Sequence, residues 1–311
     1  MSQITNTVLM VRPAKFRMNE QTAVNNYFQE NLEAKQEEVA KNAIEEFDTF
    51  VQKLKMVGVE VIVVDDTETP DTPDAVFPNN WISFHENGDI GVYPMFAENR
   101  RLERREDVFS MVEARGYHIN QIIDYTEAEE EEIYLEGTGS IILDRVHKIA
   151  YCALSARADE DLFIEFCEDF EYAPVIFNAY QTVDGKRMPI YHTNVMMAIA
   201  ETFAVICLDT IDDKKEKKAV VKQLKESGKE VIAITEAQMH QFAGNMLQVM
   251  GNDNRPFLVM SSTAYNSLTK AQIGAIEKHC AILHTDLNTI ETCGGGSARC
   301  MLAEVFLPKE V

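Results

Sequence analysis

The chain has 311 residues, of which 29 are lysine or arginine and 51 are aspartate or glutamate, so its formal net charge is −22. This charge argues against a nucleic-acid partner and against docking on an anionic membrane, because both require a basic surface. Hydrophobic residues make up 46% of the chain, as in ordinary globular proteins, and we expect its partner to be a small molecule.

Targeting and cysteine patterns favour an ordinary cytoplasmic protein. The chain starts without a basic segment followed by an apolar core, and no run approaches the roughly 18 apolar residues that span a bilayer. The six cysteines are too scattered for a disulfide scaffold, and none forms a Cys-x-x-Cys pair typical of structural zinc. We expect reduced thiols and neither metal nor other cofactor. The sequence is compatible with a homo-oligomer.

An amphipathic helical segment, a turn and a short β-branched run occur together five times along the chain. The helix and strand pairs are Glu37–Val57 with Val59–Asp66, Arg101–Arg115 with Tyr117–Tyr125, Asp159–Phe170 with Ala173–Ala179, Asp213–Ser227 with Lys229–Thr235, and Tyr265–Cys280 with Ala281–Leu287. Gly58 and Gly228 stand where a left-handed helix cap is needed. Because each unit is too small to bury its own apolar face, we predict one domain over residues 1–311 that closes into a ring. A doubly wound open sheet is the alternative, although no Gly-x-Gly-x-x-Gly follows an early strand.

One polar segment follows each unit. The segments cover residues 74–81, 135–140, 191–195, 242–246 and 294–300, and one residue from each lies 53 to 56 positions after its predecessor: Asn80, Glu136, His192, Asn245 and Cys300. Equivalent positions of a ring share one radius and height. We therefore predict that these five side chains converge near a common axis.

The residue types at these positions suggest covalent catalysis. Cys300 follows three glycines, which allow the backbone to approach a ligand closely, and a thiolate beside an imidazolium is a nucleophile. His192 would serve as general acid and base, and Glu136 is either a turn-forming acceptor or a functional carboxylate. Each signal is weak alone, because a buried thiol and a hydrogen-bonded histidine are common. A carboxylate, an imidazole and a thiol in register favour a hydrolytic site.

These segments resemble the guanidino-group-modifying superfamily of arginine deiminases, dimethylarginine dimethylaminohydrolases and amidinotransferases. The resemblance lies in Leu135-Glu-Gly-Thr-Gly-Ser, His192-Thr-Asn and Gly294-Gly-Gly-Ser-Ala-Arg-Cys, and it covers nearly the whole chain. It implies the α/β pentein fold, a five-bladed propeller of five pseudo-symmetric repeats. Within the superfamily, the chain is most similar to the citrulline-utilisation hydrolase branch. This similarity lies in Arg12-Pro13, Phe16–Asn19, Phe77–Trp81 and Tyr191–Met197.

The resemblance also implies roles for individual residues. Cys300 would attack the central carbon of a guanidino or ureido group, His192 would protonate the departing nitrogen and then activate water, and Glu136 would orient the substrate nitrogens. Arg157 matches a family position that holds the substrate α-carboxylate. Arg299 and Arg12 are weaker candidates for that role, and a surface ion pair is the alternative for any of them.

The substrate-binding positions depart from those of arginine-acting members. Asn80 and Asn194 stand where those enzymes usually carry Asp. Carboxylates suit a guanidinium, whereas amides suit a neutral ureido group. We expect Asn245 in the substrate site as well, and Asp74 keeps a carboxylate available.

The activity expected from these departures is hydrolysis of citrulline to ornithine, carbon dioxide and ammonia. An arginine deiminase or dimethylarginine dimethylaminohydrolase is the first alternative. A catalytically silent, acidic ligand-binding protein is the second.

Overall fold

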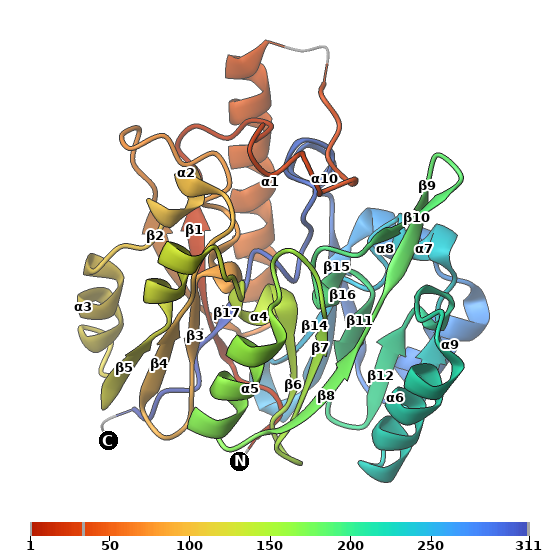
Figure 1. Ribbon diagram of the computed structural model, residues 1–311. Coiled ribbons are helices and arrows are strands. Elements are labelled where there is room, and N and C mark those ends of the chain that lie inside the picture. The colour runs from red at the N-terminus through yellow and green to blue at the C-terminus, as the bar shows by residue number, and fades with distance from the viewer. Residues whose placement is uncertain (1, 33–34, 310–311) are drawn as a thin grey trace.

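The computed structural model describes residues 2–32 and 35–309. Within these ranges the strands form five separate three-stranded sheets and one hairpin (Figure 1). Every three-stranded sheet has one order: an antiparallel first pair and a parallel second pair. The fold is therefore mixed α/β, and a single open parallel sheet is excluded. The closure of the units into a propeller stays a prediction.

The strands follow the five units in chain order. The sheets contain β17 (Ala303–Glu304), β1 (Thr7–Arg12) and β2 (Glu60–Asp65); β3 (Ile82–Phe84), β4 (Asp89–Val92) and β5 (Gln121–Asp124); β6 (Ile141–Asp144), β7 (Ile149–Ala153) and β8 (Ala173–Phe177); β11 (Met197–Ile199), β12 (Phe203–Ile206) and β13 (Glu230–Ala233); and β14 (Leu247–Met250), β15 (Pro256–Ser261) and β16 (Ala281–Thr285). The hairpin consists of β9 (Tyr180–Val183) and β10 (Lys186–Pro189).

The helices connect and cover these sheets. The α-helices are α1 (Gln36–Met56), α2 (Glu98–Arg101), α3 (Asp107–Glu113), α4 (Gly137–Ser140), α5 (Glu160–Asp169), α6 (Lys214–Glu226), α7 (Glu236–Met239), α8 (Ser262–Ser267), α9 (Lys270–Glu277) and α10 (Asn288–Gly294). Short 3-10 helices are η1 (Pro78–Asn80), η2 (Thr126–Glu131), η3 (Thr193–Val195), η4 (Leu208–Thr210) and η5 (Asn252–Asn254). No helix within the described ranges is long and apolar enough to cross a membrane.

The long helices bury the apolar stripes that the sequence predicts. Helix α1 packs on β2 and β16 through side chains three or four residues apart, among them Ala43, Phe47, Phe50 and Leu54. Helices α5 and α6 pack on β8 and β13. They begin at aspartates whose carboxylates cap the first turn by accepting two backbone N–H bonds each. Gly58 and Gly228 adopt φ of +90° and +73°, as the predicted helix ends require.

Two predicted helices are wrong in extent. Of the helix expected over Arg101–Arg115, only α3 is found, and Arg101 is the last residue of the separate helix α2. The inward-facing pair Val108 and Val112 provides an apolar stripe only within α3. The helix expected over Tyr265–Cys280 breaks after Ser267, the last residue of α8. There Thr269 starts α9 with a capping box, while Ser261 caps α8.

The repeated sheet order positions the polar segments. Each segment leads directly into the first strand of a sheet: η1 into β3, α4 into β6, η3 into β11, residues 242–246 into β14, and residues 294–300 into β17. The first strands contact one another, β17 with β3, β6 with β11, and β11 with β14, and α4 contacts both η1 and η3. Equivalent positions of the five units are thereby gathered in one region.

Candidate active site

The structure brings the five register residues together. Asn80, His192 and Cys300 line one narrow buried cavity. Glu136 is bonded to His192, and Asn245 is bonded to the Cys300 sulfur. Further lining comes from Thr22, Asn26, Asp74, Phe77, Arg100, Arg157, Tyr191 and the glycines 294–296.

Two amide side chains point at the Cys300 sulfur. The Nδ2 atoms of Asn194 and Asn245 lie 3.3 and 3.2 Å from Sγ, and Cys300 is 4% exposed. The Asn245 carbonyl oxygen accepts a hydrogen bond from the backbone N–H of Arg299 at 3.0 Å, which fixes the NH₂ group on the sulfur side. Both donors can stabilise the negative charge that the sulfur carries when it attacks a substrate carbon. The sequence predicts both amides in the substrate site, whereas the structure directs their NH₂ groups to the nucleophile.

The glycines before Cys300 permit close packing around it. Gly295 has φ of +63° and ends α10. A Cβ atom on Gly294 or Gly296 would lie only 2.8 Å from the Phe77 ring. Larger residues at these two positions would therefore push Phe77, which lines the cavity, out of place.

His192 and Glu136 form a buried pair. His192 Nε2 lies 2.7 Å from Glu136 Oε2, and the other carboxylate oxygen accepts the N–H of Phe96 at 2.9 Å. Burial lowers the pKa of His192 to about 4, although the bond to Glu136 opposes this. Burial works against ionisation of Glu136, but the charge of Arg157, the hydrogen bond from His192 and the charges of His192 and Arg100 hold its pKa well below the usual range. The pair is therefore a carboxylate and a neutral imidazole at neutral pH.

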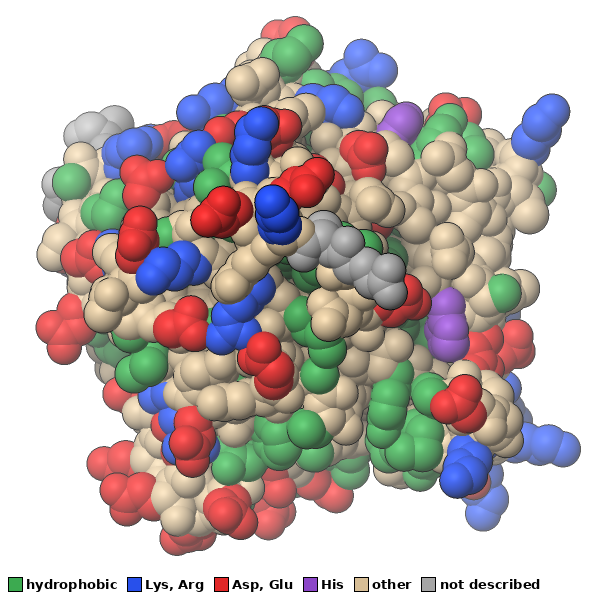
Figure 2. All heavy atoms as spheres, turned by 90° about the horizontal axis from the view of Figure 1, so that it is seen from above, with side chains coloured by type: hydrophobic (Ala, Val, Ile, Leu, Met, Phe, Trp, Pro, Cys, Tyr) green, Lys and Arg blue, Asp and Glu red, His purple; other side chains and the backbone are tan. Residues whose placement is uncertain are grey.

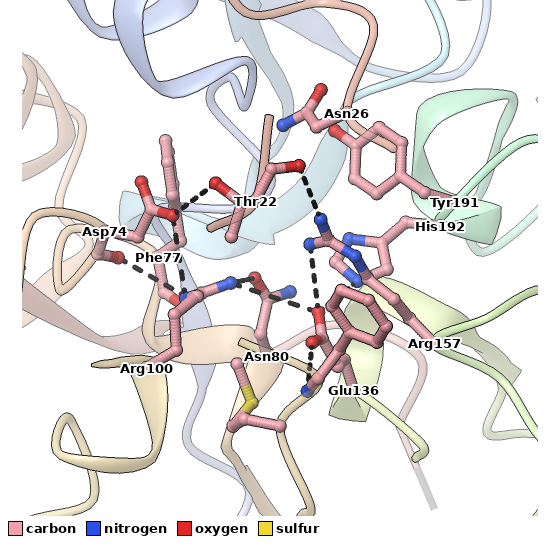
Figure 3. A network of polar contacts seen from close by, with 12 residues as sticks. Thr22, Asn26, Asp74, Phe77, Asn80, Arg100, Glu136, Arg157, Tyr191 and His192 are labelled. Carbon is pink, nitrogen blue, oxygen red and sulfur yellow. Dashed lines mark hydrogen bonds and ion pairs between the residues drawn. The ribbon is translucent and has the colours of Figure 1, made fainter. Parts of the chain in front are cut away.

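Arg100 is a site residue that the sequence reasoning missed. Its guanidinium makes two 2.9 Å bonds to Glu103 and donates from Nη1 to Asn80 Oδ1 at 2.7 Å (Figure 3). The carbonyl oxygen of Asn80 is thus occupied. Its NH₂ group donates one hydrogen to Asn79 Oδ1 at 3.1 Å and keeps the second for a ligand in the cavity that Asn80 lines. The spacing of Arg100 and Glu103 by three residues was the available signal.

Asp74 presents an unused acceptor. Its Oδ2 accepts bonds from Asn19 Nδ2 at 2.8 Å and Thr22 Oγ1 at 3.1 Å, whereas Oδ1 has no hydrogen-bond partner among the described residues. Burial raises the pKa of Asp74. A buried carboxylate oxygen with a free lone pair in a cavity can accept a substrate N–H.

Residues 19–30, here called the roof segment, cover the cavity. The segment lies beside α10 (Figure 1), where Asn26 Nδ2 donates to the Gly294 carbonyl at 3.3 Å. Asn25 Oδ1 accepts two bonds from Arg157, so the expected carboxylate-binding guanidinium is already engaged. The segment has no helical or alternating pattern, and sequence periodicity could not place it.

Arg299 and Arg12 are not brought to the cavity. Arg299 donates to the Leu302 carbonyl at 2.7 Å and to Glu304 at 2.8 Å. Arg12 makes a two-bond ion pair with Asp48, at 2.7 and 2.8 Å. Of the three arginines proposed for the substrate carboxylate, the structure therefore brings only Arg157 to the cavity.

The other five cysteines are free and buried. Burial raises the pKa of each thiol, to about 11 for Cys207 and Cys280 and about 12 for Cys167. They are inert side chains of the core, as expected. Within the described residues, no group of three or more His, Cys, Asp or Glu side chains is arranged to hold a metal ion.

Surface charge on the face seen in Figure 2 is mixed. Lysines and arginines are scattered among aspartates and glutamates, and no broad basic area appears on this face. A nucleic-acid phosphate backbone would require such an area.

A family model described as N,N dimethylarginine dimethylhydrolase, eukaryotic, matches residues 12–307. No curated protein matches the chain significantly. The superfamily expected from the sequence motifs is therefore confirmed.

Solved structures share the fold at low sequence identity. Apo ArgZ, an arginine dihydrolase from the ornithine–ammonia cycle in Cyanobacteria, superposes with a TM-score of 0.74 and 16% identity, over 98% of this chain but 41% of that one. The N-terminal domain of ArgZ bound to product superposes with a TM-score of 0.71 and 17% identity, over 97% of this chain and 99% of that one. DDAH from Pseudomonas aeruginosa, a cysteine-to-serine mutant complexed with citrulline, superposes with a TM-score of 0.65 and 12% identity. The match covers 97% of this chain and 99% of that one. This chain thus corresponds in length to the N-terminal domain of ArgZ.

Proposed function

The chain belongs to the N,N dimethylarginine dimethylhydrolase family, and we propose that it is a cysteine-dependent hydrolase of the citrulline ureido group. The products are ornithine, carbon dioxide and ammonia. The proposed catalytic residues are Cys300, His192 and Glu136.

One observation carries the choice of a neutral substrate. Amide donors surround the nucleophile: Asn194 and Asn245 contact its sulfur. Arg100 occupies the oxygen of Asn80, and one N–H of the Asn80 amide, beside the one bonded to Asn79, is left for a ligand. Attack on a ureido carbon places negative charge on the former carbonyl oxygen, which needs donors. A guanidinium would need acceptors at the same positions.

The reaction proceeds through a thiocarbamate. The Cys300 thiol transfers its proton to His192, and the sulfur bonds to the ureido carbon. The terminal C–N bond breaks, and the departing nitrogen takes the proton from His192 and leaves as ammonia. Water, deprotonated by His192, then attacks the thiocarbamate carbon and displaces the Cys300 sulfur. The resulting carbamate loses carbon dioxide to give ornithine.

Glu136 and Arg157 hold the reacting groups in this scheme. The Glu136 carboxylate fixes the His192 ring through the 2.7 Å bond and stabilises its protonated form. Arg157 binds the substrate α-carboxylate, which takes the place of Asn25 Oδ1. The roof segment must therefore move when substrate enters.

An arginine or methylarginine hydrolase is the second candidate. The unpartnered Oδ1 of Asp74 favours it, because a buried carboxylate is the acceptor that a guanidinium requires. A citrulline reaction uses Asp74 only as an acceptor for a neutral ureido N–H.

Product analysis distinguishes the two candidates. The protein is incubated with citrulline, arginine, methylated arginines or agmatine, and ornithine, citrulline and ammonia are measured, with Cys300→Ser as the control. Ornithine and ammonia from citrulline, absent with C300S, support the proposal. Faster turnover of arginine than of citrulline refutes the citrulline assignment, and no turnover of any of these compounds refutes the hydrolase.

We also propose that the five units are blades of one closed propeller forming a single domain over residues 1–311. The identical order of the five sheets and the contacts between their first strands support it. An experimental structure in which any neighbouring pair of first strands lies apart would refute it.

A further inference from the structure

A second cavity lies behind the roof segment, separate from the one that contains Cys300. It has a volume of about 370 Å³ and is bounded by the roof segment, the β9–β10 hairpin, the loop after α7 and helix α10. Cavities of this size hold small organic ligands. Tyr191 and Gly295 line the catalytic cavity but not this one.

Gln181 of β9 is the unusual feature of this cavity. The side chain is 1% exposed, yet neither its amide nitrogen nor its amide oxygen has a hydrogen-bond partner among the described residues. An unpaired buried amide costs free energy that an apolar side chain of similar size would avoid. A ligand that pairs with the amide removes this cost.

The charge of the cavity selects the sign of its ligand. Glu291 and Glu30 line it, and no lysine or arginine is among the described residues that do so. Burial raises the pKa of Glu291 to about 7, and a nearby cation would favour its ionised form. The net charge of −22 also attracts cations from a distance.

An aromatic wall completes the site. Phe28 packs against Phe242 and His240, with ring centroids 5.4 and 5.5 Å apart. His240 Nε2 is a third atom of this cavity without a described partner. Aromatic faces stabilise ammonium groups and cover alkyl chains.

We infer that this cavity is a binding site for a small ligand with an ammonium at one end of an alkyl stem and a polar group at the other, such as a basic amino acid. The ammonium pairs with Glu291, the stem lies against Phe28 and Phe242, and the amide of Gln181 pairs with a polar end of the ligand. Glu291 also accepts a 2.6 Å bond from Ser297 Oγ, so the ligand sits one hydrogen bond away from the loop that carries Cys300.

Calorimetry with L-lysine tests the site, because lysine has no ureido or guanidino group to be hydrolysed. L-norleucine, which lacks the side-chain ammonium, is the control ligand. We expect lysine to bind, and norleucine to bind at least about tenfold more weakly. This readout is independent of turnover, so it remains informative if the proposed hydrolase activity is wrong.

Two variants place lysine in one cavity or the other. Gln181→Met should weaken lysine binding at least about tenfold, and Asp74→Asn, which alters the catalytic cavity, should leave it unchanged.

Q181M should also raise the melting temperature without ligand by about 2 °C, because an unpaired amide is removed. Gln248→Met is the matched control: its buried amide accepts the Glu201 N–H at 2.8 Å, so it should lower the melting temperature. Absence of lysine binding, wild-type binding by Q181M, or loss of binding in D74N would each overturn the inference.

Discussion

His192 and Glu136 are joined by a 2.7 Å hydrogen bond in which both side chains are almost fully buried. Arg157 Nη1 lies 3.4 Å from the same carboxylate, so one buried anion faces an arginine and an imidazole. The arginine supplies the permanent positive charge. The imidazole is therefore neutral until a reaction step gives it a proton, which suits a general base.

This relationship predicts a loss of stability in mild acid. The folded-state pKa of His192 is about 4, below the unfolded value of about 6.5, so the unfolded chain takes up the proton first. The contribution is fully present above pH 6.5 and is lost as pH falls toward 4. It amounts to about 3 kcal/mol. Chemical denaturation of wild type and His192→Gln between pH 4 and 7.5 should show a shallower decline for H192Q. Parallel curves would contradict this assignment.

Selective alkylation is expected at Cys300. Burial raises the pKa of the other five thiols. The Cys300 sulfur instead lines a cavity and contacts two amide donors, which stabilise the charge of an attacking sulfur. Brief treatment with iodoacetamide near neutral pH, followed by peptide mass spectrometry, should modify Cys300 first. Cys300→Ser should remove the fast phase. Equal labelling of all six thiols would indicate a catalytically silent protein.

The losses of turnover from replacing Cys300 and His192 should not be additive. Cys300→Ser and His192→Ala are each expected to reduce turnover by about 10⁴-fold or more, with little change in melting temperature. Because both act on one proton and one carbon, the double variant should be scarcely slower than either single variant. Rates of ornithine release from the three proteins test this. Multiplicative losses would mean that the two residues do not share a mechanism.

The sequence predicts the repeat well because its period has a structural cause. Each polar segment precedes the first strand of a sheet, so Asn80, Glu136, His192, Asn245 and Cys300 occupy equivalent positions. Sequence reasoning missed Arg100 because this residue lies outside that register. It precedes the helix predicted over Arg101–Arg115 by one residue, whereas the structure places it within α2.

Other parts of the site leave no pattern in the sequence. The roof segment is irregular, and irregular segments carry no periodic signal. Arg299 is a candidate for the substrate carboxylate because it precedes Cys300 in the sequence, but its side chain extends to Glu304 instead. Adjacency along a chain does not place two side chains on one face.

The neutral amides around the nucleophile should not tolerate replacement by carboxylates. Asn194 donates to Cys300 Sγ at 3.3 Å, and its Oδ1 has no partner among the described residues. Asn194→Asp replaces the donor with a carboxylate and disfavours a negative charge on the sulfur. Citrulline turnover at pH 7 should therefore fall, by about tenfold for each 1.4 kcal/mol by which the attacking sulfur is destabilised. Iodoacetamide labelling of Cys300 at the same pH should slow as well.

Asn80→Asp provides the contrast. Arg100 Nη1 already bonds to Asn80 Oδ1 at 2.7 Å, so a carboxylate there keeps this bond, while the donor toward the ureido oxygen is lost. We expect N80D to lose citrulline turnover with no change in the labelling profile, and to gain weak arginine binding measurable by calorimetry. One donor to a developing oxyanion contributes about 3 kcal/mol, so the loss in kcat should approach 10²-fold. If N80D hydrolyses citrulline as fast as wild type, Asn80 does not face the reacting oxygen, and the amide argument for a ureido substrate fails.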